Sequence, residues 1–283
     1  MYIFPSPNFL LNNTLICANI SIMEILKEEI TNIKKELEKD FIDPIEKGVL
    51  KHFVLNGSKF IRSRFAVLYL KTQNIEINDD INKILAVGEI IHNASLLHDD
   101  VIDNAYLRRN EITLAKRFSP KLSILAGDYL LGFGMSKLIS IKNFEILVLF
   151  KNCTVQMANA EIKQLFLRDK MPTVSEYIDI CKGKTASLFA TILESSAIIS
   201  DINTENARKF GEFFGICFQI NNDMEKKSAD LDKNNGIYTA KDVLGIEKTT
   251  SLLDNYKKEM SIILKEIPKN IYKEELEDLI NKL

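Results

Sequence analysis

Apolar residues recur at helical spacing along most of the chain, and this pattern predicts a protein built from long helices. In residues 23–41, Ile30, Ile33 and Leu37 share one face while Glu and Lys occupy the others, which is typical of an amphipathic helix. Further helices are predicted over residues 122–138, 151–167, 203–226 and, as a charged pair, 255–283. Only six prolines and eleven glycines interrupt the 283 residues, so the pattern predicts an all-α fold.

The first 22 residues differ in composition from the rest of the chain. They contain prolines and asparagines but neither lysine nor arginine, so they lack the basic segment with which a signal peptide begins. We expect residues 1–22 to be a loosely ordered extension, with Met23 as a candidate translation start. Residues 23–283 are then expected to form a single helical domain.

Charge and cysteine content narrow the class of protein. The 37 Lys and Arg residues nearly balance the 39 Asp and Glu residues, so nucleic-acid binding is not expected. No uninterrupted apolar run approaches the roughly 18 residues of a membrane span, so no transmembrane segment is expected. The four cysteines are scattered without CxxC spacing, at Cys17, Cys153, Cys181 and Cys217. This distribution is typical of a reduced, cytoplasmic protein in which cysteines act as small apolar side chains.

The segment from His92 to Asp103 places acidic residues behind an apolar helical run. Asp99 and Asp103 are four residues apart, so on a helix they lie within about 40° of each other. Their like charges repel, and a bound divalent cation would offset that repulsion. Oxygen ligands favour Mg²⁺, which shares its shell with substrate phosphates. Arg108 and Arg109, beyond the helix, could bind the remaining phosphate oxygens, although a solvated acidic turn is the alternative.

A second group of charges lies at the start of an apolar helix that begins near Phe65. Lys59 and Arg62 are three residues apart after a turn that contains Gly57. Cationic side chains at a helix N-terminus form an anion site, although such residues are more often simply solvated. His92 has a similar alternative, because an isolated histidine on an apolar helix is commonly a hydrogen-bonded core residue.

Taken in order, these motifs resemble the trans-isoprenyl diphosphate synthases of the polyprenyl synthetase family. DDVID at residues 99–103, followed by Arg108 and Arg109, resembles the first aspartate-rich motif of that family. Residues 57–62 resemble its GGKxxR segment, except that Ser58 replaces the second glycine and Ser63 replaces the usual proline. The resemblance covers residues 40–250 and implies a single large helical bundle around a central cavity, assembled as a homodimer.

The resemblance also implies roles for individual residues. The residues implied to hold the diphosphate of isopentenyl diphosphate are Lys59, Arg62, His92 and Arg109. Arg108 is implied to hold the allylic diphosphate. The residues implied to act in catalysis at that diphosphate are Asp100, Lys184, Thr185 and Gln219. The metal ligands would be Asp99 and Asp103, with Mg²⁺ as the cofactor.

One motif departs from the family pattern. In the family, FQxxDDxxD supplies a second aspartate-rich motif that binds a further Mg²⁺. Here Asn222, Asp223 and Lys226 stand where three acids are expected. This loss favours an alternative, a weakly active or regulatory subunit of a heteromeric synthase, whereas the intact first motif argues against it. A terpene cyclase is a more distant alternative, because it binds one diphosphate and would leave the Lys59 and Arg62 segment unused.

The implied reaction is a Mg²⁺-dependent prenyl transfer, in which isopentenyl diphosphate condenses with an allylic diphosphate. Short-chain members of the family carry bulky aromatic residues just before the first motif, where this chain has Ala94 and Ser95. Small residues leave the hydrocarbon tunnel open, with Met135 as a deeper floor. We therefore expect a trans-polyprenyl product longer than farnesyl diphosphate.

Overall fold

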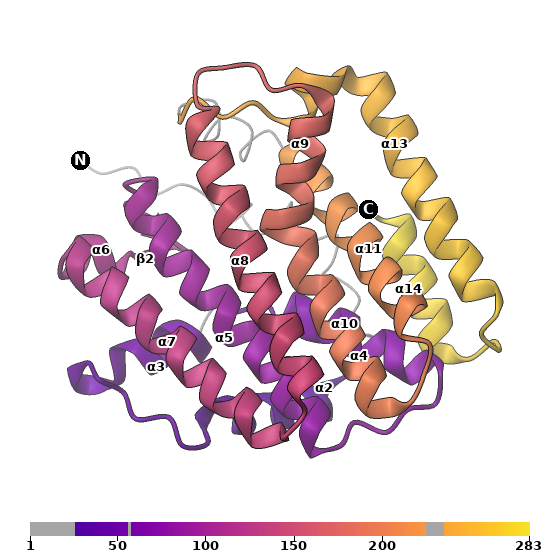
Figure 1. Cartoon of the computed structure of the whole chain (residues 1–283), viewed down its shortest axis with the longest axis horizontal. Helices are drawn as coiled ribbons and strands as arrows, with labels where there is room; N and C mark the ends of the chain where they lie inside the picture. The colour runs from indigo at the N-terminus through magenta and orange to yellow at the C-terminus, as the bar shows by residue number, and fades with distance from the viewer. Residues whose placement is uncertain (1–25, 56–57, 225–234) are drawn as a thin grey trace, which may run out of the picture.

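The computed structural model describes residues 26–55, 58–224 and 235–283 (Figure 1). The first helices are α2 (Lys27–Glu38), η2 (Glu46–Gly48), α3 (Val49–Leu55), α4 (Ile61–Thr72) and α5 (Asp79–Ile102). A hairpin of β1 (Leu107–Arg108) and β2 (Glu111–Ile112) comes after them. The predicted extension at residues 1–22 and the candidate start Met23 lie outside the described residues.

The chain then continues in helices to its end. The middle group is α6 (Leu114–Arg117), α7 (Pro120–Ile141), α8 (Phe144–Phe166), α9 (Val174–Cys181), η3 (Lys182–Ala186) and α10 (Ser187–Ser200). The last group is α11 (Thr204–Met224), α13 (Ala240–Lys265) and α14 (Ile271–Asn281). The predicted all-α fold is confirmed. Figure 1 shows α6 and α7 at one edge of the bundle and α13 at the other, with α5, α8 and α10 between them.

Helix α5 runs through the bundle and packs against α2, α4, α7 and α10. It begins at Asn78, whose side chain accepts a hydrogen bond from the Ile81 N–H at 2.9 Å. It ends at Asp103, whose N–H still donates to the Asp99 carbonyl at 2.8 Å. Asn104 then takes a positive φ of 52° and turns the chain away. Asp99 and Asp103 therefore occupy the last turn of the central helix.

A cluster of aromatic rings fixes α4 against α10 and α11. The Phe65 ring stacks on Phe214 with centroids 3.8 Å apart and meets the edge of Phe189 at 5.5 Å. All three side chains are buried, and burial of such large rings contributes much of the core energy. The cluster thereby holds the first turn of α4, which carries Arg62, beside α10 and α11.

A capping box opens α9. The Thr173 hydroxyl accepts from the Glu176 N–H at 3.2 Å, and the Glu176 carboxylate accepts from the Thr173 N–H at 2.9 Å. The helix then passes into η3, a single π turn that contains Lys184 and Thr185. Such turns occur often at functional sites, because the extra residue per turn redirects neighbouring side chains.

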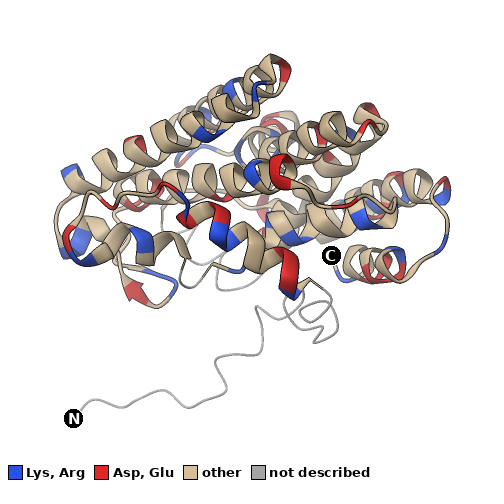
Figure 2. Cartoon of the chain, turned by 90° about the horizontal axis from the view of Figure 1, so that it is seen from below, with Lys and Arg blue, Asp and Glu red and all other residues tan. Residues whose placement is uncertain are grey.

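Helix α7 bears on the expectation that the chain has no transmembrane segment. Among the residues that the structure describes, it is the one helix long and apolar enough to cross a membrane by length and composition, although 39% of its most apolar window is buried in the bundle. Because α7 mixes apolar residues with Ser and Gly, it contains no uninterrupted apolar run that would have indicated this from the sequence. Elsewhere, as Figure 2 shows, acidic and basic residues are interspersed along the helices.

Candidate active site

Two cavities meet at Asp99. The smaller, about 230 Å³, is bounded by α9, η3, α11 and the end of α5, and Asp103 also lines it. The larger, about 580 Å³, runs between α4, α5, α7, α8 and α11 and is the predicted central cavity. The residues that line both are Asp99, Arg108, Lys184 and Gln219. The apolar part of the larger wall includes Ile91, Leu131, Met157 and Phe218. A polar chamber thus opens into a mainly apolar one.

Asp99 and Asp103 fit a divalent cation. Burial raises the pKa of Asp99 to about 6, with the nearby Glu161 and Asp103 carboxylates adding to the shift and Lys184 opposing it. The Asp103 carboxylate accepts a hydrogen bond from Arg168 at 2.6 Å. Among the described residues no group of three or more His, Cys, Asp or Glu is arranged to hold a metal. Mg²⁺ needs only one or two protein carboxylates when water and substrate phosphates complete its shell, so this donor set is sufficient.

Asp100 has a different place from the one expected. Its side chain is fully buried and accepts from the Arg108 guanidinium at 2.8 Å and 2.7 Å. Asp100 lies outside both cavity walls, so the expectation that it is a catalytic group is corrected: it positions Arg108. The reason is helical phase, because the residue after Asp99 points about 100° away from it. The Asp100–Arg108 pair fixes one cation at the junction of the cavities.

The hairpin after α5 separates the two neighbouring arginines. Arg108 pairs with Glu111 in the strand register, which leaves Arg109 and Asn110 as a two-residue loop with φ of 53° and 67°. Positive φ at both central positions is typical of a type I′ hairpin turn and is uncommon for arginine. Arg109 donates to the Phe53 carbonyl at 3.2 Å and to the Asn93 side chain at 3.3 Å. The hairpin therefore directs Arg109 toward α3 and Arg108 toward the cavities.

Arg62 and His92, which were expected to hold the diphosphate of isopentenyl diphosphate, both line the wall of the larger cavity. Burial lowers the pKa of Arg62 to about 10, although Glu89 opposes the shift. Its Nε is buried and has no hydrogen-bond partner among the described residues, so it is a donor in need of a ligand. Burial also lowers the pKa of His92 well below 6.5, and Arg62 and Arg109 add to that effect. His92 is therefore neutral at pH 7.

Glu89 was missed by the sequence analysis. It is buried, with 2% of its surface exposed, and accepts from the Ser63 hydroxyl at 2.7 Å and the Ser63 N–H at 3.3 Å. The Ser58 hydroxyl also reaches it, at 3.5 Å. The two serines that depart from the GGKxxR-proline pattern thus converge on one carboxylate. A glutamate on an otherwise apolar helix face, three residues before His92, was the available signal.

Lys59 lies outside the cavity wall that Arg62 and His92 line. Its side chain is exposed on the segment before α4 and is absent from the walls of both cavities. Its carbonyl accepts from the Arg64 guanidinium at 2.9 Å. Phe60 takes a left-handed conformation that ends the helical phase between Lys59 and Arg62, and the expected role of Lys59 beside Arg62 and His92 stays a prediction.

The π turn places the next two predicted residues in the site. The Lys184 ammonium contacts Glu161 at 2.6 Å and Gln164 at 2.7 Å, both on α8. Burial lowers its pKa, but Asp99 and Glu161 outweigh burial and the net shift is upward. The Thr185 hydroxyl donates to the Gln219 carbonyl oxygen at 2.6 Å. Glu161 and Gln164, expected to face the cavity or simply a polar helix face, therefore hold Lys184.

Asp223 is the surviving acid of the second motif. Its carboxylate accepts from the Tyr177 hydroxyl at 2.5 Å and from the Gln219 amide at 2.7 Å. Asn222 lines the larger cavity, and Lys226 lies outside the described residues. Both Asp223 oxygens are thus used to orient the two neighbouring side chains.

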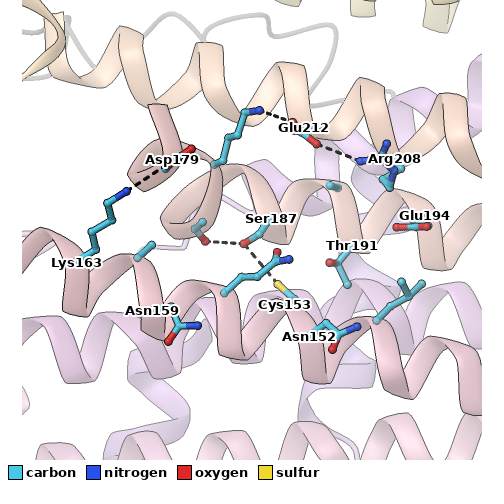
Figure 3. A pocket seen from close by; sticks show the side chains of 16 residues that line it. Asn152, Cys153, Asn159, Lys163, Asp179, Ser187, Thr191, Glu194, Arg208 and Glu212 are labelled. Carbon is cyan, nitrogen blue, oxygen red and sulfur yellow. Dashed lines mark hydrogen bonds and ion pairs between the residues drawn. The ribbon is translucent and has the colours of Figure 1, made fainter. Parts of the chain in front are cut away.

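A further cavity of about 670 Å³ lies on the other side of α8 (Figure 3). Its charges pair across it: Glu212 contacts both Lys182 and Arg208, and Lys163 contacts Asp179. These ion pairs balance the charge of the wall. We therefore place the site at the two cavities that share Asp99.

Three residues were expected to set product length, and only one of them lies in a cavity wall. Ser95 lines the larger cavity. Ala94 is fully buried in the core, and Met135 packs against the core, and neither belongs to the cavity wall. Of these three residues, Ser95 is the one in the cavity wall.

A sequence model of the polyprenyl synthetase family matches residues 43–282. The chain belongs to this family. Its relatives include a prenyl transferase of Cyanidium caldarium, 31% identical over 73% of this chain and 67% of the relative. The octaprenyl diphosphate synthase of Escherichia coli is 31% identical over 65% of this chain and 59% of that protein. The predictions that the chain belongs to the polyprenyl synthetase family and is a trans-prenyltransferase are therefore confirmed.

Solved structures agree with the fold. A decaprenyl diphosphate synthase from Rhodobacter capsulatus superposes with a TM-score of 0.82 at 19% identity, covering 92% of this chain and 97% of that one. A polyprenyl synthase from Caulobacter crescentus, complexed with calcium and isoprenyl diphosphate, gives 0.76 at 19% identity, covering 92% and 95%. These similarities show a shared fold.

Proposed function

We propose that the protein is a Mg²⁺-dependent trans-prenyltransferase that condenses isopentenyl diphosphate with an allylic diphosphate. The observation that carries the proposal is the meeting of the two cavities at Asp99, where acids and cations from α5, the hairpin, η3 and α11 converge. A substrate with a charged diphosphate and a long apolar tail matches a polar chamber that opens into an apolar one.

The chemistry of the reaction is consistent with this arrangement. Mg²⁺ held by Asp99 and Asp103 would neutralise charge on the allylic diphosphate and improve it as a leaving group. Arg108 and Lys184 stabilise the negative charge that develops as the carbon–oxygen bond breaks. The double bond of isopentenyl diphosphate, held near Arg62, attacks the allylic cation, and loss of a proton gives the longer trans product. Positioning and electrostatics supply the catalysis, so the enzyme forms no covalent intermediate.

The product is longer than farnesyl diphosphate. The support is the small side chain of Ser95 in the wall of the larger cavity, one helical turn before Asp99. A serine leaves room there for the growing hydrocarbon chain.

Product analysis tests this function. Purified protein is incubated with Mg²⁺, labelled isopentenyl diphosphate and either farnesyl or geranylgeranyl diphosphate, and the products are separated by chromatography. We expect a ladder that extends beyond farnesyl diphosphate and disappears when EDTA removes the metal. No elongation from any primer would overturn the proposal and favour a regulatory subunit.

The protein acts as a homodimer in the cytoplasm. Support for the dimer comes from exposed apolar side chains on neighbouring helices α7 and α8: Leu125, Ile139, Phe144, Val155 and Ile162. A second copy of this chain would cover them, which also accounts for the apolar character of α7. Light scattering at micromolar concentration should give twice the chain mass, and Leu125→Glu should reduce the measured mass toward that of the monomer.

The support for a cytoplasmic location is that the three cysteines among the described residues are free and buried.

A further inference from the structure

Arg168 lies beside the first aspartate-rich motif but belongs to none of the recognised motifs. It comes after α8, in the loop that leads to α9, and its guanidinium is 2.6 Å from the Asp103 carboxylate. The side chain is 24% exposed. Its Nε is buried and has no hydrogen-bond partner among the residues that the structure describes. Arg168 thus brings a cation with unused donor capacity to the edge of the polar chamber.

The loop that carries Arg168 is held in place. The Asp169 N–H donates to the Gly236 carbonyl at 2.8 Å, which ties the loop to the segment before α13. A Cβ on Gly236 would come within 2.4 Å of the Asp169 carboxylate, so only glycine permits this approach. Leu167 and Pro172, on either side of Arg168, line the smaller cavity together with Tyr238. Leu167 and Pro172 therefore belong to the wall of the smaller cavity, and Arg168 lies beside that wall at Asp103 rather than in it.

The other cations of the chamber already have fixed partners. Arg108 is held by Asp100, and Lys184 is held by Glu161 and Gln164. Among the described residues, the side that faces the second motif offers little free charge, because Asn222 is neutral and Asp223 is engaged by Tyr177 and Gln219. A guanidinium on this side would add positive charge for a bound diphosphate.

A cation bound at Asp103 would lie beside Arg168. Arg168 contacts one oxygen of the Asp103 carboxylate, at 2.6 Å, and the other oxygen remains for a cation. The diphosphate that completes the metal shell would then be the anion next to the guanidinium. A guanidinium matches phosphate oxygens with two parallel hydrogen bonds.

We propose that Arg168 is a ligand of the allylic diphosphate and that it supplies positive charge where the second motif has lost its acids. The proposal rests on the proposed function, since it assumes that an allylic diphosphate binds at Asp99 and Asp103. In this arrangement Arg168 keeps its contact with Asp103 and donates its unused hydrogen bonds to the diphosphate.

The test compares Arg168→Gln and Arg168→Lys with Lys170→Gln. Lys170 is an exposed cation of the same loop, and its ammonium contacts the Phe166 carbonyl at 3.4 Å. Arg168 lies in a loop and its side chain is partly exposed, so Arg168→Gln should fold. Thermal melting of each variant checks this.

Two readouts are used. The first is the KM for farnesyl diphosphate and, separately, for isopentenyl diphosphate. The second is calorimetric binding of farnesyl thiodiphosphate, an unreactive analogue, in the presence of Mg²⁺. Loss of a hydrogen bond to a charged group weakens binding by about tenfold or more.

For Arg168→Gln we expect the KM for farnesyl diphosphate to rise and the affinity for the analogue to fall, each by about tenfold or more. The KM for isopentenyl diphosphate should stay within about twofold of wild type. Arg168→Lys should recover part of the lost affinity, and Lys170→Gln should match wild type. Unchanged analogue affinity in Arg168→Gln, with tighter Mg²⁺ binding, would overturn the proposal and leave Arg168 as a competitor for Asp103. The calorimetry needs no turnover, so it decides the role of Arg168 even if the wild-type protein fails to elongate any primer.

Discussion

Individual residues act here through their burial as much as through their chemical type. His92 lies in the cavity wall among arginines, and burial holds its pKa well below 6.5. A histidine in the unfolded chain takes up a proton as the pH falls below 6.5, whereas folded His92 resists it. His92 therefore lowers the free energy of unfolding at low pH, and this effect vanishes at neutral pH.

This imbalance predicts the pH dependence of stability. Below about pH 6.5 the His92 contribution should lower the free energy of unfolding by up to about 1.4 kcal/mol per pH unit, until the folded pKa is reached. Urea unfolding of wild type and His92→Gln at pH 7, 6 and 5 measures it. The wild type should lose stability relative to the variant as the pH falls. A constant difference over this range would contradict the prediction.

Glu89 gives a second prediction at this scale. Glu89→Gln removes the negative charge that offsets Arg62 and weakens the hydrogen bonds from Ser63. We expect the free energy of unfolding to fall by about 1–3 kcal/mol and the KM for isopentenyl diphosphate to rise, with the KM for the allylic substrate unchanged. Urea unfolding and steady-state kinetics measure the two effects. Glu274→Gln, which removes an exposed pair with Lys269, is the control; equal behaviour of the two variants would refute a role for Glu89 in the site.

At the scale of elements, the π turn η3 depends on a close approach to α8. A Cβ on Gly183 would lie 2.6 Å from the Ala160 Cβ and 3.1 Å from the Gln156 carbonyl oxygen. These contacts are too short, so Gly183 permits a spacing at which Lys184 reaches Glu161. The sequence showed a Lys-Thr pair beside glycine but did not show which helix the glycine faced.

Gly183→Ala should therefore separate η3 from α8 and displace Lys184. We expect kcat to fall by at least about tenfold, because small displacements of catalytic groups are costly, and the melting temperature to fall as well. Asn159→Ala, at an exposed position of α8 next to Ala160, is the control and should change neither. Wild-type kcat in Gly183→Ala would show that the helix spacing has no part in catalysis.

At the scale of the whole molecule, we expect the depth of the larger cavity to set the product length. Ser95→Phe adds a ring to the wall one turn before Asp99, so the hydrocarbon chain should meet it earlier. Chromatography of the products should show a shorter ladder, while Ser95→Ala should leave the product distribution unchanged. If Ser95→Phe folds and gives the wild-type distribution, Ser95 does not limit the chain.

Much of this architecture could be predicted from the sequence alone. Helical periodicity and the scarcity of glycine and proline determined the all-α fold, and the four-residue spacing of Asp99 and Asp103 placed both carboxylates on one turn. The motif order determined the family, and the capping box at Thr173 determined where α9 begins. These features are local, because they depend on residues within a few positions of one another.

Tertiary structure decided which side chains meet. The burial of Asp100 beneath Arg108, the exposure of Lys59 and the contact between Arg168 and Asp103 each depend on segments whose relative orientation the sequence does not state. Arg168 and Asp103 are 65 positions apart, and Glu89 meets Ser63 across 26. Contacts at such separations arise from helix packing and loop geometry, which no local pattern encodes.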